Sequence, residues 1–346
     1  MIGLATIGTS AITRNLLDAV AQNPAIRHTV VHSRDAARGR AFAEEVGAAR
    51  VVTRLEDLAE AEDVDAVYIA SPNAAHHDQA LQMLEAGKHV LVEKSACVTP
   101  AGWQDLVDTA RDRGLALLEA NRNSVWHPGI AALRDLLPQI GRIRMSSLSY
   151  CQRSSRYDRY LAGETPAIFD PAMGAGALMD IGSYPLESMI ELFGRPSDFS
   201  TEAVLLRHDD RPGTTDTPTT ATGAAADHQV IDGAGVLLAH YPGHLCTVTW
   251  SKISDSAAPS VIQGEDGTLS VDAVEDPSVL SLTTGGRTRT TEIPRRRIRD
   301  MAHELDAFAA AVADPSRCAL PQRWTAERLT LMAQIRARTG VQLAGR

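Results

Sequence analysis

A glutamate and a lysine, Glu93 and Lys94, directly follow an apolar run of the sequence, His89 to Val92. In open α/β sheets, ligands bind in the crevice outside the carboxyl ends of the strands, and this pair is expected there. A lysine shielded from water at that point can have a lowered pKa and exchange a proton with a substrate hydroxyl. An isolated Glu-Lys pair more often caps a strand in solvent, so the surrounding pattern has to decide.

Alternating apolar runs and helical patterns in residues 1–122 predict the elements that position this pair. Strands are expected at 2–7, 28–31, 51–52, 66–70, 89–92 and 115–118, and helices near 12–22, 35–46, 74–86 and 100–113. Such alternation predicts a doubly wound parallel sheet, that is, an NAD(P)-binding Rossmann domain.

The turn after the first predicted strand has the position of a dinucleotide site. There the pyrophosphate meets backbone N–H groups and the positive end of a helix dipole. Of the usual GxGxxG pattern the sequence keeps only the first glycine, and Ser10 and Thr13 stand at the other two glycine positions. The residues predicted to bind cofactor in this turn are Gly8, Thr9, Ser10 and Ile12.

The end of the second predicted strand indicates which cofactor is used. An enzyme that selects NAD usually has an acid there for the ribose 2′-hydroxyl, whereas this sequence has Ser33 and Arg34, with Arg38 one helical turn later. A guanidinium and a hydroxyl suit a 2′-phosphate, so NADP is favoured and NAD is the alternative. The other interpretation is that Asp35 caps the next helix while Arg34 is solvated, and both can hold.

Residues 123–346 change in character and predict an α+β domain for substrate binding and oligomerisation. Alternating patterns predict a large, mostly antiparallel, open-faced sheet with helices on one face. Strands are expected at 142–152, 199–207, 227–240, 244–253, 259–264, 268–273 and 278–282, and helices at 184–193, 299–313 and 323–338. Residues 209–224 are expected to form a surface loop, and the closing helices are expected to pack back on the first domain.

Composition argues against several classes of function. The 346 residues carry 34 basic and 43 acidic side chains, and a net charge of −9 makes nucleic acids and anionic membranes poor partners. No run approaches the roughly 20 apolar residues of a membrane span, and the N-terminus is expected to be a strand, not a secretory signal. The four scattered cysteines indicate reduced thiols in a cytoplasmic enzyme.

Several motifs, in this order along the chain, resemble those of one family. They are the GxSxI turn at Gly8, ASPNxxHHxxA from Ala70, AGKHVLVEK ending at Lys94 and GxGALMDIGSYP from Gly174. Together they resemble the Gfo/Idh/MocA oxidoreductases, which include glucose–fructose oxidoreductase, inositol dehydrogenase and dimeric dihydrodiol dehydrogenase. The resemblance covers essentially the whole chain and implies hydride transfer between a nicotinamide and a carbinol carbon.

The resemblance also implies three catalytic residues. The family's Glu-Lys-Pro motif falls on Glu93-Lys94-Ser95, with serine in place of proline, and its lysine orients the substrate hydroxyl. A second motif, an acid followed four residues later by His or Tyr, falls on Asp180 and Tyr184, which helical spacing places on one face. Beside the lysine cation, Tyr184 is expected to have a lowered pKa and to relay the proton. The alternatives are that Asp180 caps the helix and that Tyr184 is an ordinary aromatic residue.

Further site residues are predicted with less support. One of the two histidines, His76 or His77, is expected to face the nicotinamide crevice and the other to face solvent, and neither has metal-ligand spacing, so no metal is expected. The additional residues predicted to bind cofactor are Ser71, Pro72, Asn73, His76, Glu93, Lys94 and Asn121. Those predicted to border the substrate are His77, Arg122, Arg156 and Tyr157, although loop residues of this kind are as often structural.

The sequence thus predicts an NADP-dependent oxidoreductase acting on a sugar, cyclitol or vicinal diol. Two alternatives remain open: a non-catalytic nucleotide sensor that keeps the fold, and a redox-neutral sugar-modifying enzyme with tightly held NAD(P). Self-association to a dimer or tetramer is expected through the second domain's sheet, because Val236 to Leu238 and Leu245 to Trp250 are richer in apolar residues than a free face normally is.

Overall fold

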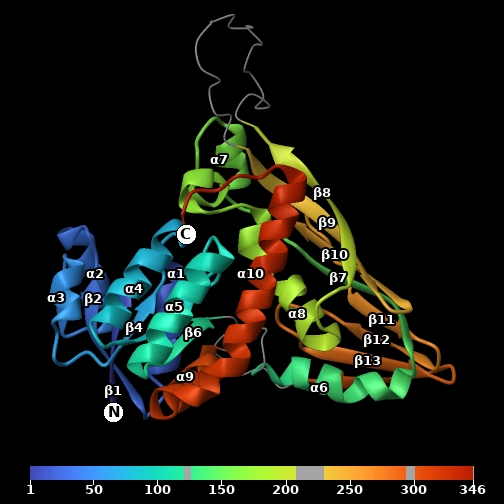
Figure 1. The fold of residues 1–346 in the computed structure, drawn as a ribbon, viewed down its shortest axis with the longest axis horizontal. Helices are drawn as coiled ribbons and strands as arrows, with labels where there is room; N and C mark the ends of the chain where they lie inside the picture. Colours follow the sequence, from blue (N-terminus) through green and yellow to red (C-terminus); the bar gives the residue numbers. More distant parts are fainter. Residues whose placement is uncertain (121–125, 208–229, 294–300, 346) are drawn as a thin grey trace, which may run out of the picture.

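The computed structural model describes residues 1–120, 126–207, 230–293 and 301–345. The predicted loop at 209–224 and the predicted site residues Asn121 and Arg122 lie outside these ranges. Figure 1 shows two regions side by side, each built on one sheet, with a long helix between them.

The first region is a six-stranded, wholly parallel sheet of order β3-β2-β1-β4-β5-β6. This is the strand order of a dinucleotide-binding fold, with its crevice where the order reverses, between β1 and β4. The strands are β1 (Ile2–Ile7), β2 (Ile26–His32), β3 (Arg50–Val52), β4 (Ala66–Ile69), β5 (His89–Glu93) and β6 (Leu117–Ala120).

Helix boundaries in this region follow from local capping. The Asp35 carboxylate accepts hydrogen bonds from two N–H groups at the start of α2, and Gly47 ends that helix in the left-handed conformation. At the start of α5 the Thr99 hydroxyl accepts one such hydrogen bond, from Gly102 N, and Pro100 lies in the first turn, while Gly114 ends the helix as Gly47 ends α2. The helices are α1 (Ala11–Val20), α2 (Ala36–Val46), α3 (Leu55–Ala59), α4 (His76–Glu85) and α5 (Pro100–Arg113).

Both faces of this sheet are covered. One core joins the sheet to α4 and α5, and the other joins it to α1, α2 and α9 (Met301–Ala313). The last helix, α10 (Ala319–Thr339), contributes Leu329 to the first of these cores and Leu331, Met332 and Ile335 to the core of the second region. The closing helices therefore pack back on the first region, and α10 runs between the two sheets (Figure 1).

The second region is an eight-stranded sheet of order β14-β13-β12-β11-β7-β10-β9-β8. Every neighbouring pair is antiparallel except β7 and β10, which are parallel. Its strands are β7 (Ile143–Cys151), β8 (Asp198–Leu206), β9 (Ile231–Tyr241), β10 (His244–Ser251), β11 (Ser260–Gly264), β12 (Gly267–Val271), β13 (Val279–Thr284) and β14 (Arg287–Glu292). The helices of this region are α6 (Pro128–Leu136), α7 (Tyr157–Leu161) and α8 (Ser183–Phe193).

Three short elements were not predicted. Strand β14 reads RTRTTE and is exposed along its whole length, so it lacks the apolar alternation that marks a half-buried strand. Helices α3 and α7 have five residues each, too few for a helical period to be visible. Short 3₁₀ turns occur at Asn73–Ala75, Leu137–Ile140, Ala167–Phe169, Pro171–Met173 and Pro315–Cys318.

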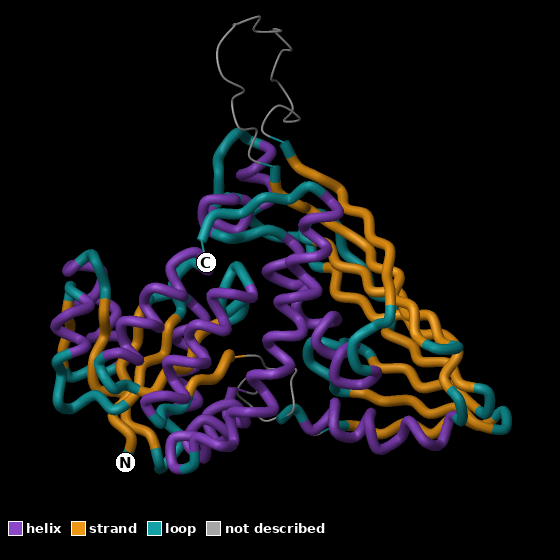
Figure 2. Tube along the Cα trace, viewed as in Figure 1, coloured by secondary structure: helices purple, strands orange, loops and turns teal. Residues whose placement is uncertain are grey.

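The large sheet has one open face, as Figure 2 shows by the helices on one side only. The prediction of its apolar surface was partly wrong, because strand alternation turns Leu237, Val248 and Trp250 into the core, where they are fully buried. On the open face, Val204 (54% exposed), Met145 (43%) and Val236 (39%) are the large apolar side chains that solvent reaches most.

A buried ion cluster fastens α10 to both regions. The Arg328 guanidinium, which is fully buried, contacts Glu119 of β6 and donates a 2.6 Å hydrogen bond to Glu187 of α8. Burial raises the pKa of Glu187 to about 8 despite the neighbouring arginine. Because each partner lies on a different element, the cluster connects α10 to β6 and to α8 at once.

Candidate active site

One carboxylate, Asp180, is held between two lysines. The Nζ atom of Lys94, at the end of β5, donates to Asp180 Oδ1 and to the Asp180 carbonyl oxygen, both at 2.7 Å. The Nζ atom of Lys252, directly after β10, lies 2.8 Å from Asp180 Oδ2. Three segments distant in the sequence therefore meet at the carboxyl end of the parallel sheet, where the crevice was expected.

The predicted pKa shift of Lys94 was wrong in direction. Burial by itself lowers the pKa of this ammonium, but the charge of Asp180 and the hydrogen bond to it outweigh burial, and the pKa is raised. Burial likewise works to raise the pKa of Asp180, yet Lys94 and Lys252 hold it well below its ordinary value. Near neutral pH, Lys94 is a cation and Asp180 an anion, so Lys94 acts as a hydrogen-bond donor and not as a base.

Tyr184 lies in the first turn of α8, beside the lysine. Lys94 Nζ is 5.3 Å from the centroid of its ring, a cation–π distance, and Tyr150 of β7 packs edge-on against the ring at 5.6 Å. The structure thus brings together the three predicted catalytic residues. Within the described part of the chain, the Tyr184 hydroxyl has no hydrogen-bond partner, so it can serve a substrate.

A π-helical turn, Leu178–Gly182, presents Asp180 to the lysines. Its start is anchored by Asp232 of β9, which accepts hydrogen bonds from Leu178 N (2.7 Å) and from the indole of Trp250 (3.0 Å). Turns of this kind occur inside helices and are frequent at functional sites. Asp180 thus sits inside a helical segment and does not cap one.

The residues around Lys94 are fixed from within the protein. The Glu93 carboxylate accepts hydrogen bonds from the Tyr68 hydroxyl (2.6 Å) and from Lys94 N (3.2 Å), which makes it a support for the lysine. The peptide bond between Lys94 and Ser95 is cis. Ser95 Oγ donates to the Met179 carbonyl, so the segment after the lysine also touches the turn that carries Asp180.

Both histidines are buried, which corrects their predicted roles. The ring nitrogens of His76 lie 2.9 Å and 2.7 Å from the carbonyl oxygens of Ser95 and Ser71, and burial lowers the pKa of the ring. His77 is 1% exposed and lies between the carboxylates of Asp78 and Asp105. Neither ring reaches solvent, so the prediction that one of them faces solvent was wrong, whereas contact of either ring with cofactor or substrate stays a prediction.

The turn between β1 and α1 fits a dinucleotide pyrophosphate. Gly8 has a φ of +110°, and a Cβ atom there would lie 2.7 Å from the Ala70 carbonyl oxygen, so only glycine lets β1 and β4 approach so closely. The Ser10 side chain does not cap α1, which leaves N–H groups of its first turn for an anion. Thr9 and Ser10 are half-buried, and Ile12 packs its side chain on the core, so its main chain is the part near the turn.

At the end of β2 the expected pattern of charges is present. Arg34 and Arg38 are exposed, and neither guanidinium has a hydrogen bond or ion pair within the described residues. Ser33 Oγ donates to the Asp35 carbonyl at 2.9 Å, while the Asp35 carboxylate caps α2. The capping interpretation of Asp35 is therefore confirmed, and it leaves both guanidinium groups available for a 2′-phosphate.

The remaining predicted residues occupy two loops. Ser71 Oγ donates to Gln79, Pro72 is exposed, and Asn73 Nδ2 donates to the Gly174 carbonyl at 2.8 Å, which links the turn after β4 to the second region. Tyr157 stacks on Tyr160 with ring centroids 6.2 Å apart, and Arg156 is exposed at the start of α7. A structural role for Tyr157 is evident, and contact of either residue with substrate stays a prediction.

Sequence reasoning missed Lys252, which it placed inside a strand predicted for 244–253. The composition of the chain could have indicated this residue, because the sequence has only three lysines, Lys88, Lys94 and Lys252, against 31 arginines. Two of the three touch one carboxylate.

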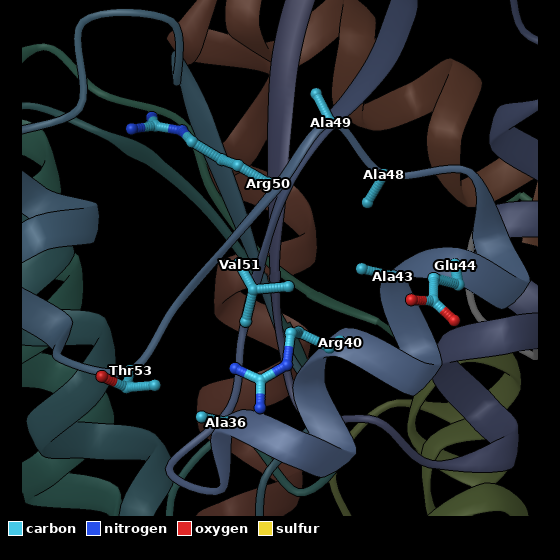
Figure 3. Close-up of a pocket in the computed structure, with 9 residues that line it drawn as sticks. All are labelled: Ala36, Arg40, Ala43, Glu44, Ala48, Ala49, Arg50, Val51 and Thr53. Carbon is cyan, nitrogen blue, oxygen red and sulfur yellow. The ribbon is translucent and has the colours of Figure 1, made fainter.

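A separate hollow of about 380 Å³ lies at the edge of the parallel sheet (Figure 3). None of the predicted site residues lines it, so it is distinct from the Lys94–Asp180 cluster. Its lining residues come from α2 and from the stretch that runs through β3: Ala36, Arg40, Ala43, Glu44, Ala48, Ala49, Arg50, Val51 and Thr53.

A glycine turn after the first strand of a 3-2-1-4-5-6 sheet, with a lysine that contacts an acid–tyrosine pair at the same edge of the sheet, is typical of a nicotinamide-dependent oxidoreductase. Residues 2–120 match the family model described as an oxidoreductase family with an NAD-binding Rossmann fold, and residues 131–270 match the GFO/IDH/MocA C-terminal domain. The chain is a member of the Gfo/Idh/MocA oxidoreductase family, which confirms the resemblance, the fold class and the enzyme class predicted from the sequence.

Two relatives and one solved structure illustrate the similarity. The scyllo-inositol 2-dehydrogenase (NADP(+)) IolU of Bacillus subtilis (strain 168) is 34% identical over 91% of this chain and 89% of its own. The trans-1,2-dihydrobenzene-1,2-diol dehydrogenase of Oryctolagus cuniculus is 29% identical over 70% of this chain and 67% of its own. The crystal structure of KijD10, a 3-ketoreductase from Actinomadura kijaniata in complex with NADP and TDP-benzene, has a TM-score of 0.82 at 25% identity and covers 99% of this chain and 98% of its own.

Proposed function

We propose that the protein is an NADP-dependent oxidoreductase that transfers a hydride between the nicotinamide and a carbinol carbon of a sugar, cyclitol or vicinal diol. The observation that carries the proposal is the 2.7 Å contact between Lys94 Nζ and Asp180 Oδ1, because it joins the two regions beside the cofactor crevice. The relatives support the substrate class, since they are named for an inositol, a dihydrodiol and a keto sugar nucleotide.

The cofactor's place is defined by residues of the first region. Bound NADP supplies the hydride acceptor or donor at its nicotinamide ring. The Gly8–Ser10 turn would hold the pyrophosphate, and Ser33, Arg34 and Arg38 would hold the 2′-phosphate. Ser71, Pro72 and Asn73 border the crevice from the end of β4, where a nicotinamide ring would lie.

Lys94 and Tyr184 would handle the substrate oxygen. An ammonium has three N–H donors, and Asp180 uses two of those of Lys94, which leaves one for the substrate. That donor stabilises negative charge on the oxygen as the C–H bond breaks or forms. The Tyr184 ring lies beside the same ammonium and its hydroxyl would pass the proton, while Asp180 keeps the lysine charged and oriented.

The proposal is tested by supplying the purified protein with inositols, aldoses and vicinal diols together with NADP⁺ or NAD⁺. We expect reduced nicotinamide to form in equal amount with oxidised product for at least one member of the panel. Absence of turnover with every substrate, in both reaction directions, would favour a nucleotide-binding sensor. Product formed without net reduced cofactor would indicate the redox-neutral alternative.

Cofactor preference is predicted to depend on Arg34. Arg34→Ala should weaken NADP(H) binding by about 1–3 kcal/mol, the loss for one charge-assisted contact, and should change NAD(H) binding little. Titration of both cofactors by nicotinamide fluorescence measures the difference. The matched control is Arg113→Ala, which removes an exposed arginine from the last turn of α5. Equal weakening of both cofactors in Arg34→Ala would contradict the assignment.

We also propose that the open sheet face mediates self-association, supported by the exposure of Met145 on β7, Val204 on β8 and Val236 on β9. Light scattering is expected to give a dimer or tetramer, and a monomer at micromolar concentration would contradict it.

Among the described residues, no helix is long and apolar enough to cross a membrane. The four cysteines are unpaired, which supports the proposed cytoplasmic location.

A further inference from the structure

We propose that Lys252 is a positioning residue of the active site, which holds Asp180 Oδ2 so that Oδ1 stays on Lys94. The proposal rests on the proposed function. Lys252 lies outside all the motifs that identify the family in this sequence, and its role is inferred from its contact alone.

Each oxygen of the Asp180 carboxylate contacts a lysine. Lys94 Nζ lies 2.7 Å from Oδ1 and Lys252 Nζ lies 2.8 Å from Oδ2, with side chains 14% and 9% exposed. The terminal torsion of an aspartate is broad, so a carboxylate with one partner can rotate about it. Two partners on opposite oxygens remove that freedom and fix the direction from which Lys94 meets a substrate.

The fold fixes Lys252 before its side chain makes any contact. Its main-chain N–H donates to the Gly233 carbonyl, and its carbonyl accepts from Ser154 N, both at 2.8 Å. The Ser251 hydroxyl accepts from Ile253 N and Ser254 N, so the chain turns as β10 ends. The ammonium thus projects from a main chain held on two sides, and the same contacts join it to the segment that leads to Arg156 and Tyr157.

The residue type agrees with this role in a chain that uses arginine almost everywhere else. A guanidinium is a planar fork that tends to take both oxygens of a carboxylate, and it would compete with Lys94 for Oδ1. An ammonium lacks that planar fork, and Lys252 Nζ meets the carboxylate at Oδ2. The third lysine, Lys88, donates to the carbonyls of Ala61 and Val64 at the opposite end of β5 and serves as a control.

The charges around Asp180 set the pH dependence. Lys94 and Lys252 contact it and Tyr150 is also close to it, while Tyr184 and Glu93 lie beside Lys94. The two lysines hold the pKa of Asp180 below its ordinary value against burial. Activity that needs ionised Asp180 is present above that pKa and lost as the pH falls through it. Loss of Lys252 raises this pKa, so the acid limb of turnover should move to higher pH.

The first experiment measures turnover against pH in three variants. Lys252→Met should lower kcat by up to about a hundredfold, the scale of a small misplacement of a catalytic group, and should move the acid limb upward. Lys252→Arg keeps the charge, so its acid limb should match the wild type while kcat still falls. Lys88→Met should match the wild type in both. A Lys252→Met enzyme with wild-type kcat and acid limb would overturn the proposal.

The second experiment needs no substrate. Protein labelled with ¹³C at lysine Cε gives signals from only three lysines, and Lys94 reports the charge of Asp180. Lys252→Met should change the chemical shift of Lys94. The further change in that shift when Asp180 is protonated should occur at a higher pH than in the wild type. Lys88→Met should leave the Lys94 signal unchanged. An unmoved Lys94 signal in folded Lys252→Met protein would overturn the proposal, and if that variant does not fold, Lys252→Arg must shift the signal instead. Failure of the proposed function would appear separately, as no turnover by the wild type despite these shifts.

Discussion

Replacing Lys94 with methionine is expected to lower kcat by about two to four orders of magnitude, the range for a group that acts directly on the reacting oxygen and its proton. The variant keeps most of the apolar stem and removes the one ammonium that can donate both to Asp180 and to a substrate. The loss should appear in single-turnover kinetics, with NADP(H) affinity nearly unchanged, because Lys94 is assigned to the substrate oxygen.

The fold should survive this change. Asp180 still has Lys252 as its partner at 2.8 Å, so no uncompensated charge is left buried. Thermal unfolding should therefore shift little, and Lys88→Met, which removes a lysine at the far end of the same strand, should turn over normally. Near-normal turnover of Lys94→Met would mean that the Lys94–Asp180 pair is structural, and the sensor alternative would gain.

Tyr184→Phe is expected to lower turnover by about a hundredfold or more, since it removes the proposed proton relay. The ring remains, with its edge contact to Tyr150 and its place under the Lys94 ammonium, so packing and stability should change little. Single-turnover rates of hydride transfer across pH would show the loss of the step that the hydroxyl serves.

Tyr241→Phe is the matched control for this variant. It also removes one tyrosine hydroxyl, which in the wild type donates to the carbonyl of Gly194, directly after the last residue of α8. Its turnover should equal the wild type. Normal turnover of Tyr184→Phe would leave the relay without a residue, because the histidines that the sequence offered in its place are buried in main-chain and carboxylate contacts.

Much of the fold could be predicted from local patterns. Apart from the five-residue helix α3, the strands and helices of residues 1–120 follow from apolar runs bounded by caps such as Asp35, Thr99 and Gly47, whose effects act within a few residues. The position of Lys94 at the carboxyl end of a parallel strand follows from the same alternation. The family motifs identified Asp180 and Tyr184 without any knowledge of where they lie.

The tertiary structure decided the properties that depend on contacts between residues far apart in the sequence. The direction of the Lys94 pKa shift is one of these properties. Burial lowers the pKa of Lys94, whereas the Asp180 carboxylate, 86 residues away in the sequence, raises it, and only the folded structure shows which effect is larger. The burial of His76 is another, since it depends on how α4 packs against the segment after β5.

Lys252 shows the same limit most clearly. From the sequence it is a lysine near the end of an alternating strand, and nothing local separates it from a solvated one. Only the register of β10 beside β7 and β9, and the turn that follows Ser251, bring its ammonium to Asp180. Local sequence determined which residues could do the chemistry, and long-range packing decided which of them meet, because a contact between distant segments is fixed by how the sheets and helices assemble around it.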